Sequence, residues 1–325
     1  MRTAFVTGIT GQTGGYLCEH LAATGWEVHG LVRDPDDLEP VFKERSPGAI
    51  LHSGDLSSAA DLRRVVTEVR PTAIFNMGGL SSVAESWNNA ELTARINGQA
   101  VATLLEVAWE LRQESGERLS FVQASSAEIF GTAVEVPQNE NTAISPVNPY
   151  GAAKAYAHHL VGVYRKAGLE ASSCILYNHE SPRRPETFVT RKITMGVARI
   201  SAGLDSVLTL GNLDVKRDWG WAPDYARAIA LAAESTPGDY IIATGQAHTV
   251  ADFVQAAFAA VDITDWEQYI EQDPAFMRAQ DARTQVGDAS RAREILGWTP
   301  SVEFAEIVSR MVKNDLELLR PTTSN

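Results

Sequence analysis

The sequence has little cysteine: 325 residues contain only Cys18 and Cys174. Two widely separated cysteines cannot form the disulfide framework of a small secreted domain. The seven histidines are scattered, and no cysteine and histidine spacing typical of a zinc site occurs. His158 and His159 are adjacent, so on a helix they would point to different sides. We therefore predict that the protein holds no metal.

Long hydrophobic runs are absent as well. The sequence has no stretch of about 18 apolar residues, and its N-terminus has no long apolar segment before a cleavage site. Basic residues are scarce, since 28 Lys and Arg stand against 41 Asp and Glu and the formal net charge is −13. Such a chain lacks the electrostatic footprint needed to bind nucleic acid or an anionic membrane, although a local basic pocket for one small anion is compatible with it. We expect a soluble, cytoplasmic protein.

The sequence does contain enough apolar residues for a large core. Hydrophobic residues make up 44% of the chain and charged residues 21%, a balance that excludes a disordered protein. The length exceeds the usual size of one domain, so we expect two lobes that share one body.

The N-terminal part of the chain alternates apolar and amphipathic segments. Residues 3–7 are apolar and end in a glycine-rich turn, residues 16–23 are amphipathic, and residues 27–32 are apolar again. This order predicts a βαβ unit, which requires a parallel sheet. Further strands are expected at 50–53, 73–77, 119–124 and 171–177, and helices at 59–69, 94–112 and 150–166.

After residue 177 this rhythm breaks. We expect a polar loop at 182–191, a helix at 192–202 and a short strand at 207–210, followed by mixed helices and loops. The predicted fold is α/β: a doubly wound parallel sheet of the Rossmann type with a smaller C-terminal lobe of mixed α/β structure. Residues 1–178 would form the dinucleotide-binding lobe. Residues 179–325 would form mainly the substrate lobe, and some of their segments, such as 220–250, are candidates for a return to the large lobe.

Gly8, Gly11 and Gly14 follow the first expected strand and open the first expected helix in the pattern G-x-x-G-x-x-G. Glycine lets the backbone turn sharply and approach a pyrophosphate, while the helix N-terminus offers unpaired N–H groups and the positive end of its dipole. This context predicts a dinucleotide site. We assign the neighbouring residues Thr10, Gln12 and Thr13 to the same site.

Further expected strands also end in residues suited to a dinucleotide. Asp55 and Leu56 follow the third strand, where a carboxylate could accept a hydrogen bond from an adenine amino group. Met77, Gly78 and Gly79 follow the fourth, with small residues where the backbone of a cofactor would pass. Ligands of open α/β sheets bind at these carboxyl ends, so we assign all five residues to the cofactor.

The end of the second strand should distinguish the two nicotinamide cofactors. An arginine there favours the additional phosphate of NADP, whereas a carboxylate favours the free ribose of NAD. The sequence has both, as Arg33 and Asp34. We favour NADP through Arg33, and NAD stays open as the second possibility.

Tyr150 and Lys154 stand four residues apart and share one face of an expected helix. A nearby ammonium, together with the positive charge of a nicotinamide ring, would lower the pKa of the phenol and make it a usable general base. Upstream, Ser126 and Glu128 follow the end of an expected strand with a hydroxyl and a carboxylate. These four residues are the catalytic candidates.

Together with the glycine turn, these residues resemble the extended short-chain dehydrogenase/reductase family, which acts largely on nucleotide sugars. Longer stretches are similar to the GDP-mannose 4,6-dehydratase family, and Asn-His-Glu-Ser-Pro-Arg-Arg, starting at Asn178, is the most specific of them. The similar stretches are 7–12, 177–184, 188–193, 211–219, 286–290 and 296–298. They extend over nearly the whole chain.

This resemblance implies a lyase that converts GDP-mannose to GDP-4-keto-6-deoxymannose by oxidation at C4, loss of water across C5 and C6, and return of the hydride. Tyr150 would take the proton of O4, and Lys154 would hold the phenol and the nicotinamide ribose. Ser126 would form a hydrogen bond to O4. Glu128 would remove the C5 proton and protonate the departing C6 oxygen.

The resemblance also implies contacts at both ends of the ligands. His179 and Arg184 would contact the cofactor, and Ser81 the sugar. The nucleotide end of the substrate would contact Asn178, Lys192, Arg217, Arg278 and Asp281. A homodimer or homotetramer is implied, and the helix at 94–112 carries apolar residues on more than one side, for instance Leu104, Leu105, Val107 and Ala108.

Several positions depart from the usual pattern of the family. Residues 125–130 read Ser-Ser-Ala-Glu-Ile-Phe, Asp34 replaces an arginine, Trp221 replaces a histidine, and residues 78–80 differ beside the sugar. A dehydratase of another GDP-sugar, such as a heptose, therefore stays open. So do a 4-keto reductase or epimerase of the same fold, which needs no Glu128, and a non-catalytic NADP-binding sensor, which needs no activated phenol.

Overall fold

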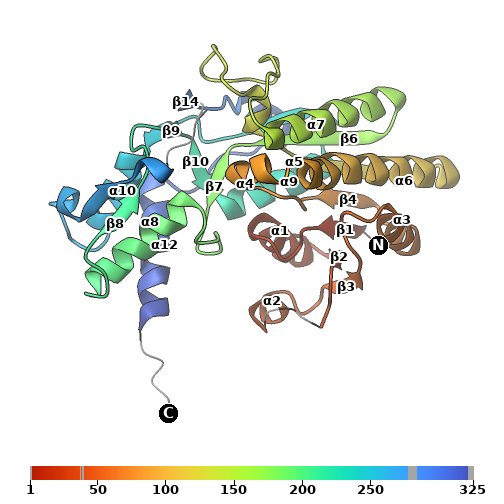
Figure 1. Cartoon of the computed structure of the whole chain (residues 1–325). Helices are drawn as coiled ribbons and strands as arrows, with labels where there is room; N and C mark the ends of the chain where they lie inside the picture. Colours follow the sequence, from red (N-terminus) through yellow and green to blue (C-terminus); the bar gives the residue numbers. More distant parts are fainter. Residues whose placement is uncertain (1, 37, 39, 277–283, 321–325) are drawn as a thin grey trace.

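A sheet of seven strands forms the centre of the protein. Its strand order is β11-β6-β5-β4-β1-β2-β3, and Figure 1 shows β1 to β4 and β6 of this sheet among the flanking helices. All neighbouring strands in it run parallel. The strands are β1 Arg2–Thr7, β2 Trp26–Val32, β3 Ile50–Ser53, β4 Ala73–Asn76, β5 Ser120–Ser126, β6 Glu170–Leu176 and β11 Asp239–Ile242. The computed structural model describes residues 2–36, 38, 40–276 and 284–320. The predicted doubly wound parallel sheet is confirmed.

Helices cover both faces of the sheet, because successive strand residues point to opposite faces. Ala4 and Val6 of β1 belong to one buried apolar cluster, and Phe5 between them belongs to the other. The first cluster includes residues of α1 Gln12–Ala23, α9 Ala222–Glu234 and α11 Ser290–Leu296, and the second includes residues of α3 Ala59–Val69, α6 Ala100–Ser115 and α7 Pro149–Ala167. Because both faces of the sheet are covered by helices, the strands and their carboxyl ends keep fixed positions.

The helix expected at 94–112 is longer and interrupted. It begins as α5 Ala90–Ala94, passes through the π-helical turn η1 Arg95–Gln99 and continues as α6. The apolar residues from Leu104 to Ala108 that pointed to a second apolar face are buried in the core of this chain. They pack against the sheet and its helices, so they are not available for contact with another subunit.

The seventh strand comes from a part of the chain where the alternation of strands and helices was expected to stop. β11 pairs with β6, and α9 before it packs against α1 on one face of the sheet. Residues 222–242 therefore lie with the large lobe. β11 has four residues, as many as β3 and β4. A strand of this length is recognised from the alternation around it, and that alternation breaks after residue 177.

The smaller lobe is built on a third apolar cluster, which joins α8 Val189–Ser201, α10 Val250–Ala259 and α12 Phe304–Leu319. α8 begins inside the expected loop at 182–191, because Thr190 and Arg191 are already buried against neighbouring elements. The short strands pair as β7 Asn178–Glu180 with β10 Trp219–Trp221, β8 Leu208–Leu210 with β13 Ile270–Gln272, and β9 Lys216–Arg217 with β12 His248–Thr249 and β14 Thr284–Gln285.

The remaining elements are short, and several of them border the strand ends. They are α2 Pro40–Arg45, α4 Val83–Asn88, and the 3-10 turns η2 Ala127–Phe130, η3 Trp266–Tyr269 and η4 Pro274–Phe276. Within the described ranges, no helix combines the length and the apolar character that crossing a bilayer requires.

Candidate active site

A cavity of about 420 Å³ lies at the carboxyl ends of the central strands, between the two lobes. It is lined by most of the residues singled out from the sequence: Gly8, Gly11, Gln12, Thr13, Gly14, Met77, Gly78, Gly79, Ser81, Ser126, Glu128, Tyr150, Lys154, Asn178, His179, Arg184 and Arg217. The lining carries three cations, Lys154, Arg184 and Arg217, against the two carboxylates of Glu128 and Glu180, so an acidic chain has a pocket with an excess of positive charge. This is the arrangement needed for a ligand with phosphate groups.

The glycine turn fits a closely approaching backbone. Gly8 has a φ of +65°, and a Cβ on it would lie 2.6 Å from the Cα of Gly78. A Cβ on Gly14 would lie 2.0 Å from the carbonyl oxygen of Gly8. Gly11 is the N-cap of α1 and provides no side-chain cap, so the first N–H groups of the helix are directed to the cavity without an internal partner. The turn can therefore bind a pyrophosphate through its backbone.

Four predicted cofactor residues lie outside the lining of this cavity. Thr10 and Arg33 are exposed after β1 and β2. Asp55 follows β3, where bonds from the Ser57 hydroxyl and N–H occupy one of its carboxylate oxygens and lower the pKa of Asp55. Leu56 lies against Gly78, since a Cβ on Gly78 would lie 2.8 Å from Cδ2 of Leu56. Leu56 thus packs against the loop after β4, which contains Gly78.

The segment after β4 is held by a residue that was not expected from the sequence. Asn97, buried in the π-helical turn, donates from Nδ2 to the carbonyl of Leu80 at 2.8 Å and accepts the N–H of Leu80 at Oδ1 at 3.0 Å. A Cβ on Gly79 would lie 2.5 Å from that Oδ1. The sequence signal that could have identified Asn97 is a polar residue on the buried face of an expected helix, because a buried polar side chain needs a hydrogen-bond partner. Asn97 fixes the loop that lines the middle of the cavity.

α7 carries both Tyr150 and Lys154 into the cavity. Asn148 caps the helix, because its Oδ1 accepts the N–H of Gly151 at 2.8 Å, and Pro149 occupies the first turn. Tyr150 is only 9% exposed. Burial raises the pKa of Tyr150 to about 12, against a hydrogen bond with Ser126 that lowers it. In the protein alone, burial therefore outweighs the lowering effect that the sequence led us to expect.

Lys154 stands at the end of a buried chain of hydrogen bonds that crosses three strands. Its Nζ donates to the carbonyl of Ala124 at 2.9 Å, and Nε2 of Gln123 donates to the same oxygen at 2.8 Å. Gln123 accepts from Asn76, and Asn76 accepts from the hydroxyl of Thr7. These hydrogen bonds hold the lysine in place. Burial lowers the pKa of Lys154 to about 8. Gln123 was not singled out from the sequence, and Asn76 was expected only as part of the strand-end segment near the cofactor.

Ser126 and Glu128 lie where β5 ends. The hydroxyl of Ser126 caps the turn η2 by accepting the N–H of Glu128 at 3.2 Å. Ser126 also forms the hydrogen bond that lowers the pKa of Tyr150, whereas the charge of Glu128 raises that pKa. Hydroxyl, carboxylate and phenol are therefore neighbours in one cavity, as the sequence predicted from their positions at a strand end and on a helix.

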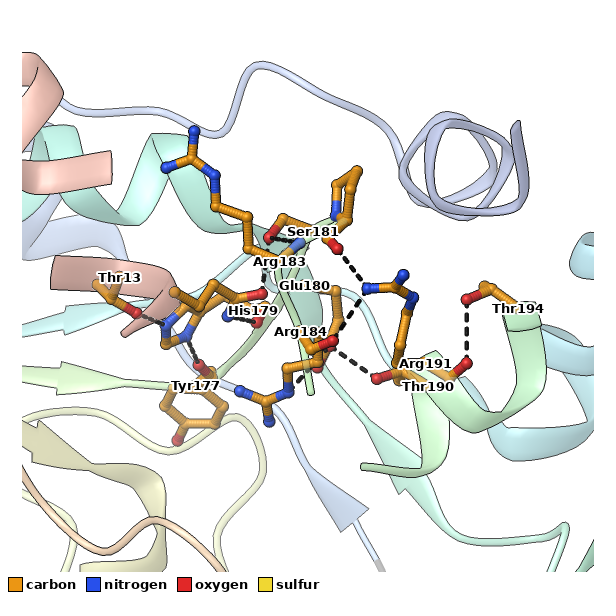
Figure 2. A network of polar contacts seen from close by, with 12 residues as sticks. Thr13, Tyr177, His179, Glu180, Ser181, Arg183, Arg184, Thr190, Arg191 and Thr194 are labelled. Atoms are coloured by element: carbon orange, nitrogen blue, oxygen red, sulfur yellow. Dashed lines mark hydrogen bonds and ion pairs between the residues drawn. The ribbon is translucent and has the colours of Figure 1, made fainter. Parts of the chain in front are cut away.

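Figure 2 shows how β7 and the segment after it support the glycine turn. Nδ1 of His179 donates to the carbonyl of Tyr177 at 2.8 Å, so Nε2 accepts the hydroxyl proton of Thr13 at 2.7 Å. Burial lowers the pKa of His179 to about 4, which keeps the ring neutral. The Gln12 side chain is also occupied, because it donates to the carbonyl of His179 and accepts from Ser181. The side chains of Gln12, Thr13 and His179 thus tie the turn to the second lobe, and the backbone N–H groups of Gln12 and Thr13 at the start of α1 remain for a ligand.

Arg184 is the second cation of the cavity, and its surroundings hold it in place (Figure 2). Its Nε lies 3.3 Å from Oε2 of the buried Glu180, which also accepts the Thr190 hydroxyl at 2.7 Å. Its guanidinium stacks on Phe188 at 3.8 Å. Burial raises the pKa of Glu180, and Arg184 opposes this effect. The positive charge of Arg184 also lowers the pKa of Tyr150.

Two of the predicted contacts to the nucleotide end of the substrate line the cavity. Asn178 does so from β7 and Arg217 from β9. Lys192 lies outside the lining, on α8, with its Nζ 3.9 Å from the ring centre of Phe276. Arg278 and Asp281 fall outside the described residues. In the described part of the chain, no group of three or more His, Cys, Asp or Glu side chains could hold a metal ion.

Comparison with known proteins gives a consistent result over the whole chain. The family model described as GDP-mannose 4,6 dehydratase matches residues 5–311. The chain is 40% identical to GDP-mannose 4,6 dehydratase 1 of Arabidopsis thaliana, with 98% of this chain and 91% of the relative covered. It is also 40% identical to GDP-mannose 4,6-dehydratase of Sinorhizobium fredii, with 99% and 98% covered.

Solved structures share the fold. The UDP-glucose 4-epimerase of Thermus thermophilus in complex with NAD superposes with a TM-score of 0.81 at 27% identity, covering 96% of this chain and 98% of the epimerase. The arrangement of the lobes is therefore one that accommodates a nicotinamide dinucleotide in a related protein.

Proposed function

The chain belongs to the GDP-mannose 4,6-dehydratase family, and on this premise we propose that it converts GDP-mannose to GDP-4-keto-6-deoxymannose with NADP as its cofactor. The observation that supports this most is Glu128 beside Tyr150 in the same cavity. A reductase or epimerase needs Ser126, Tyr150 and Lys154 but has no use for an acid and base at C5 and C6.

The cavity fits a nicotinamide dinucleotide, because Gly8 and Gly14 leave no room for a Cβ and the N-terminus of α1 is open to phosphate. A bound nicotinamide would supply the hydride acceptor for C4 of the sugar and the hydride donor for C6. Gly11 to Gly14 would hold the pyrophosphate, and Lys154 the nicotinamide ribose. Arg184 adds positive charge to the same cavity.

The proton transfers belong to the residues of the chain. Tyr150 accepts the proton of the sugar O4 as C4 is oxidised, with Ser126 as hydrogen-bond partner and Lys154 and Arg184 as the nearby cations. The C4 ketone then makes the C5 proton acidic, and Glu128 removes it. Glu128 next protonates the oxygen that leaves C6 as water. Return of the hydride to C6 leaves C5 one proton short, and Tyr150 gives the proton taken from O4 to C5, so the cycle is balanced.

The substrate can be identified directly. Purified protein is incubated with a panel of nucleotide sugars without added reductant, and loss of one water is measured by mass spectrometry. We expect dehydration of GDP-mannose. A GDP-linked heptose belongs in the panel, because residues 78–80 line the cavity and depart from the usual residues of the family. Loss of water only from the heptose would replace GDP-mannose as the substrate.

The reaction is expected to need no net cofactor, because the hydride taken from C4 returns to C6. Trace NADP should sustain many turnovers, and neither NADP nor NADPH should be consumed in proportion to product. The measurement is absorbance at the nicotinamide band during steady turnover, alongside product formation. A continuous change in that absorbance would contradict the dehydratase mechanism and favour a reductase or a simple dehydrogenase.

The preference for NADP is supported by the loop after β2. The carboxylate of Asp34 accepts the N–H of Asp36 at 2.9 Å, so it is turned into its own loop. The Ser53 hydroxyl donates to the carbonyl of Arg33 at 3.0 Å and holds the backbone of this exposed arginine. Arg33 is therefore the residue at this strand end whose side chain can meet a ribose phosphate.

Arg33→Ala is expected to weaken NADP binding about 10- to 100-fold, the worth of one charge-assisted hydrogen bond, and to leave NAD binding nearly unchanged. Equilibrium titration with both dinucleotides measures the effect. Arg64→Ala is the matched control, because Arg64 is another exposed arginine that bonds to Ser53. Equal weakening of both dinucleotides in the Arg33 variant would remove the assignment.

The expected oligomer is supported by apolar side chains that remain exposed on neighbouring helices. Trp87 of α4 is 59% exposed, and Tyr156 and Val163 of α7 are 52% and 60% exposed. We propose that a second copy of the chain covers them, because exposed apolar side chains on packed helices are typical of such contacts. Light scattering should show at least a dimer, and Val163→Glu should shift it toward the monomer. A wild-type monomer at micromolar concentration would contradict the proposal.

A further inference from the structure

Both oxygens of the Glu128 carboxylate are held by side-chain amides from different parts of the chain. Nδ2 of Asn148 donates to Oε2 at 2.7 Å, and Nε2 of Gln285 donates to Oε1 at 3.3 Å. We propose that Asn148 and Gln285 are positioning residues for Glu128, which fix the direction of its carboxylate for the loss of water. This inference rests on the proposed dehydratase function.

Asn148 links Glu128 to the helix that carries Tyr150 and Lys154. Its Oδ1 caps α7 by accepting the N–H of Gly151, while its Nδ2 binds the carboxylate. Tyr150 follows only two residues later. One buried side chain, 7% exposed, therefore sets the start of the helix and the position of Glu128 together. The group that acts at C4 and the group that acts at C5 and C6 are in this way held at a constant separation.

Gln285 approaches from the substrate lobe and is itself firmly held. It lies on β14 opposite Arg217 of β9, and its carbonyl accepts the N–H of Asp218 at 3.0 Å. The next residue, Val286, exchanges hydrogen bonds with Gln138 through its backbone. Gln285 is 4% exposed. The side-chain amide of Gln285 therefore reaches Glu128 from a backbone that is fixed by hydrogen bonds to its neighbours.

Two amide donors restrain the carboxylate but leave it reactive. A carboxylate has about four lone-pair sites, and two hydrogen bonds occupy only two of them. The free sites can take the C5 proton and deliver a proton to the C6 oxygen. The same group must serve two carbons in sequence, so its direction matters for both steps. A displacement of about 1 Å at such a group can cost about 10²-fold in rate.

Asn148→Ser separates the two roles of Asn148. Serine caps a helix about as well as asparagine, but its hydroxyl is too short to reach Glu128 while capping. We expect unchanged oxidation at C4, with loss of water slowed about 10²-fold. Ser58→Ala, which removes the N-cap of α3 far from this site, is the control for capping alone. It should lower the thermal midpoint and leave the chemistry unchanged.

Gln285→Met tests the second amide. Methionine has a similar length and suits a buried position, but it cannot donate a hydrogen bond. The readouts are the same in all variants: single-turnover absorbance of the reduced cofactor, washout of deuterium from C5 and water loss by mass spectrometry. In Asn148→Ser and in Gln285→Met, reduced cofactor should accumulate and C5 washout should slow. The double variant should be slower than either.

The outcomes separate this inference from the proposed function. If the wild-type chain removes no water from any GDP-sugar, the proposed function fails and this inference fails with it. If the wild type removes water and both variants do so at its rate without accumulating reduced cofactor, only the inference is overturned. A variant that slows C4 oxidation and water loss equally would also overturn it, because that result indicates a general distortion of the site.

Discussion

Replacing Glu128 by glutamine is expected to stop the reaction after oxidation at C4 and before loss of water. Glutamine keeps the size of the side chain and a hydrogen bond but cannot exchange a proton. General acid and base groups contribute about 10²–10⁴-fold, so water loss should fall by that factor. In a single turnover, bound NADPH should accumulate with a 4-keto sugar, and deuterium at C5 should not wash out into solvent.

The structure adds a secondary effect that a control must separate. A glutamine side chain has one acceptor oxygen, so in Glu128→Gln one of the two amides of Asn148 and Gln285 loses its acceptor. An unsatisfied buried donor costs about 1–3 kcal/mol of stability, which thermal unfolding will detect. Glu68→Gln, at an exposed ion pair on α3, is a control for the substitution itself. Near-native water loss in the Glu128 variant would mean that the acid and base lie elsewhere.

Tyr150→Phe is expected to abolish the first step rather than the second. The variant removes the group that we propose as acceptor of the O4 proton, so C4 oxidation should fall about 10²–10⁴-fold while the GDP-sugar still binds. No reduced cofactor should accumulate, which distinguishes this variant from Glu128→Gln. Single-turnover absorbance gives the rate, and equilibrium titration gives substrate affinity.

Because the Tyr150 phenol is buried, we expect Tyr150→Phe to lower the stability of the protein only slightly. Burial raises the pKa of Tyr150 to about 12, so the protein alone stabilises the neutral hydroxyl, and phenylalanine fills the same buried volume. Tyr164→Phe, further along the same helix and outside the lining of the cavity, should retain full activity. Turnover near the native rate in the Tyr150 variant would show that another group is the base.

Local sequence patterns were sufficient for the parts of the fold with strong periodicity. The six strands from β1 to β6 and the glycine turn follow from apolar runs, turn residues and their order, because these properties act over a few neighbouring residues. The strand β11 was not expected, because it lies after the break in the alternation of strands and helices, whereas the equally short β3 and β4 lie within that alternation. The π-helical turn at Arg95–Gln99 was also not expected, because it depends on how Asn97 meets Leu80.

The catalytic candidates divide in the same way. Local patterns in the sequence were enough to select the catalytic candidates: Ser126 and Glu128 at a strand end, and Tyr150 and Lys154 one helical turn apart. How these side chains are held became visible in the folded chain alone. The two residues that bind the Glu128 carboxylate, Asn148 and Gln285, are 20 and 157 residues away from it in the sequence. Thr13 and His179, which share a hydrogen bond, are 166 residues apart. Such contacts form only when distant segments pack, because hydrogen-bond partners are selected by position in space and leave no period in the chain.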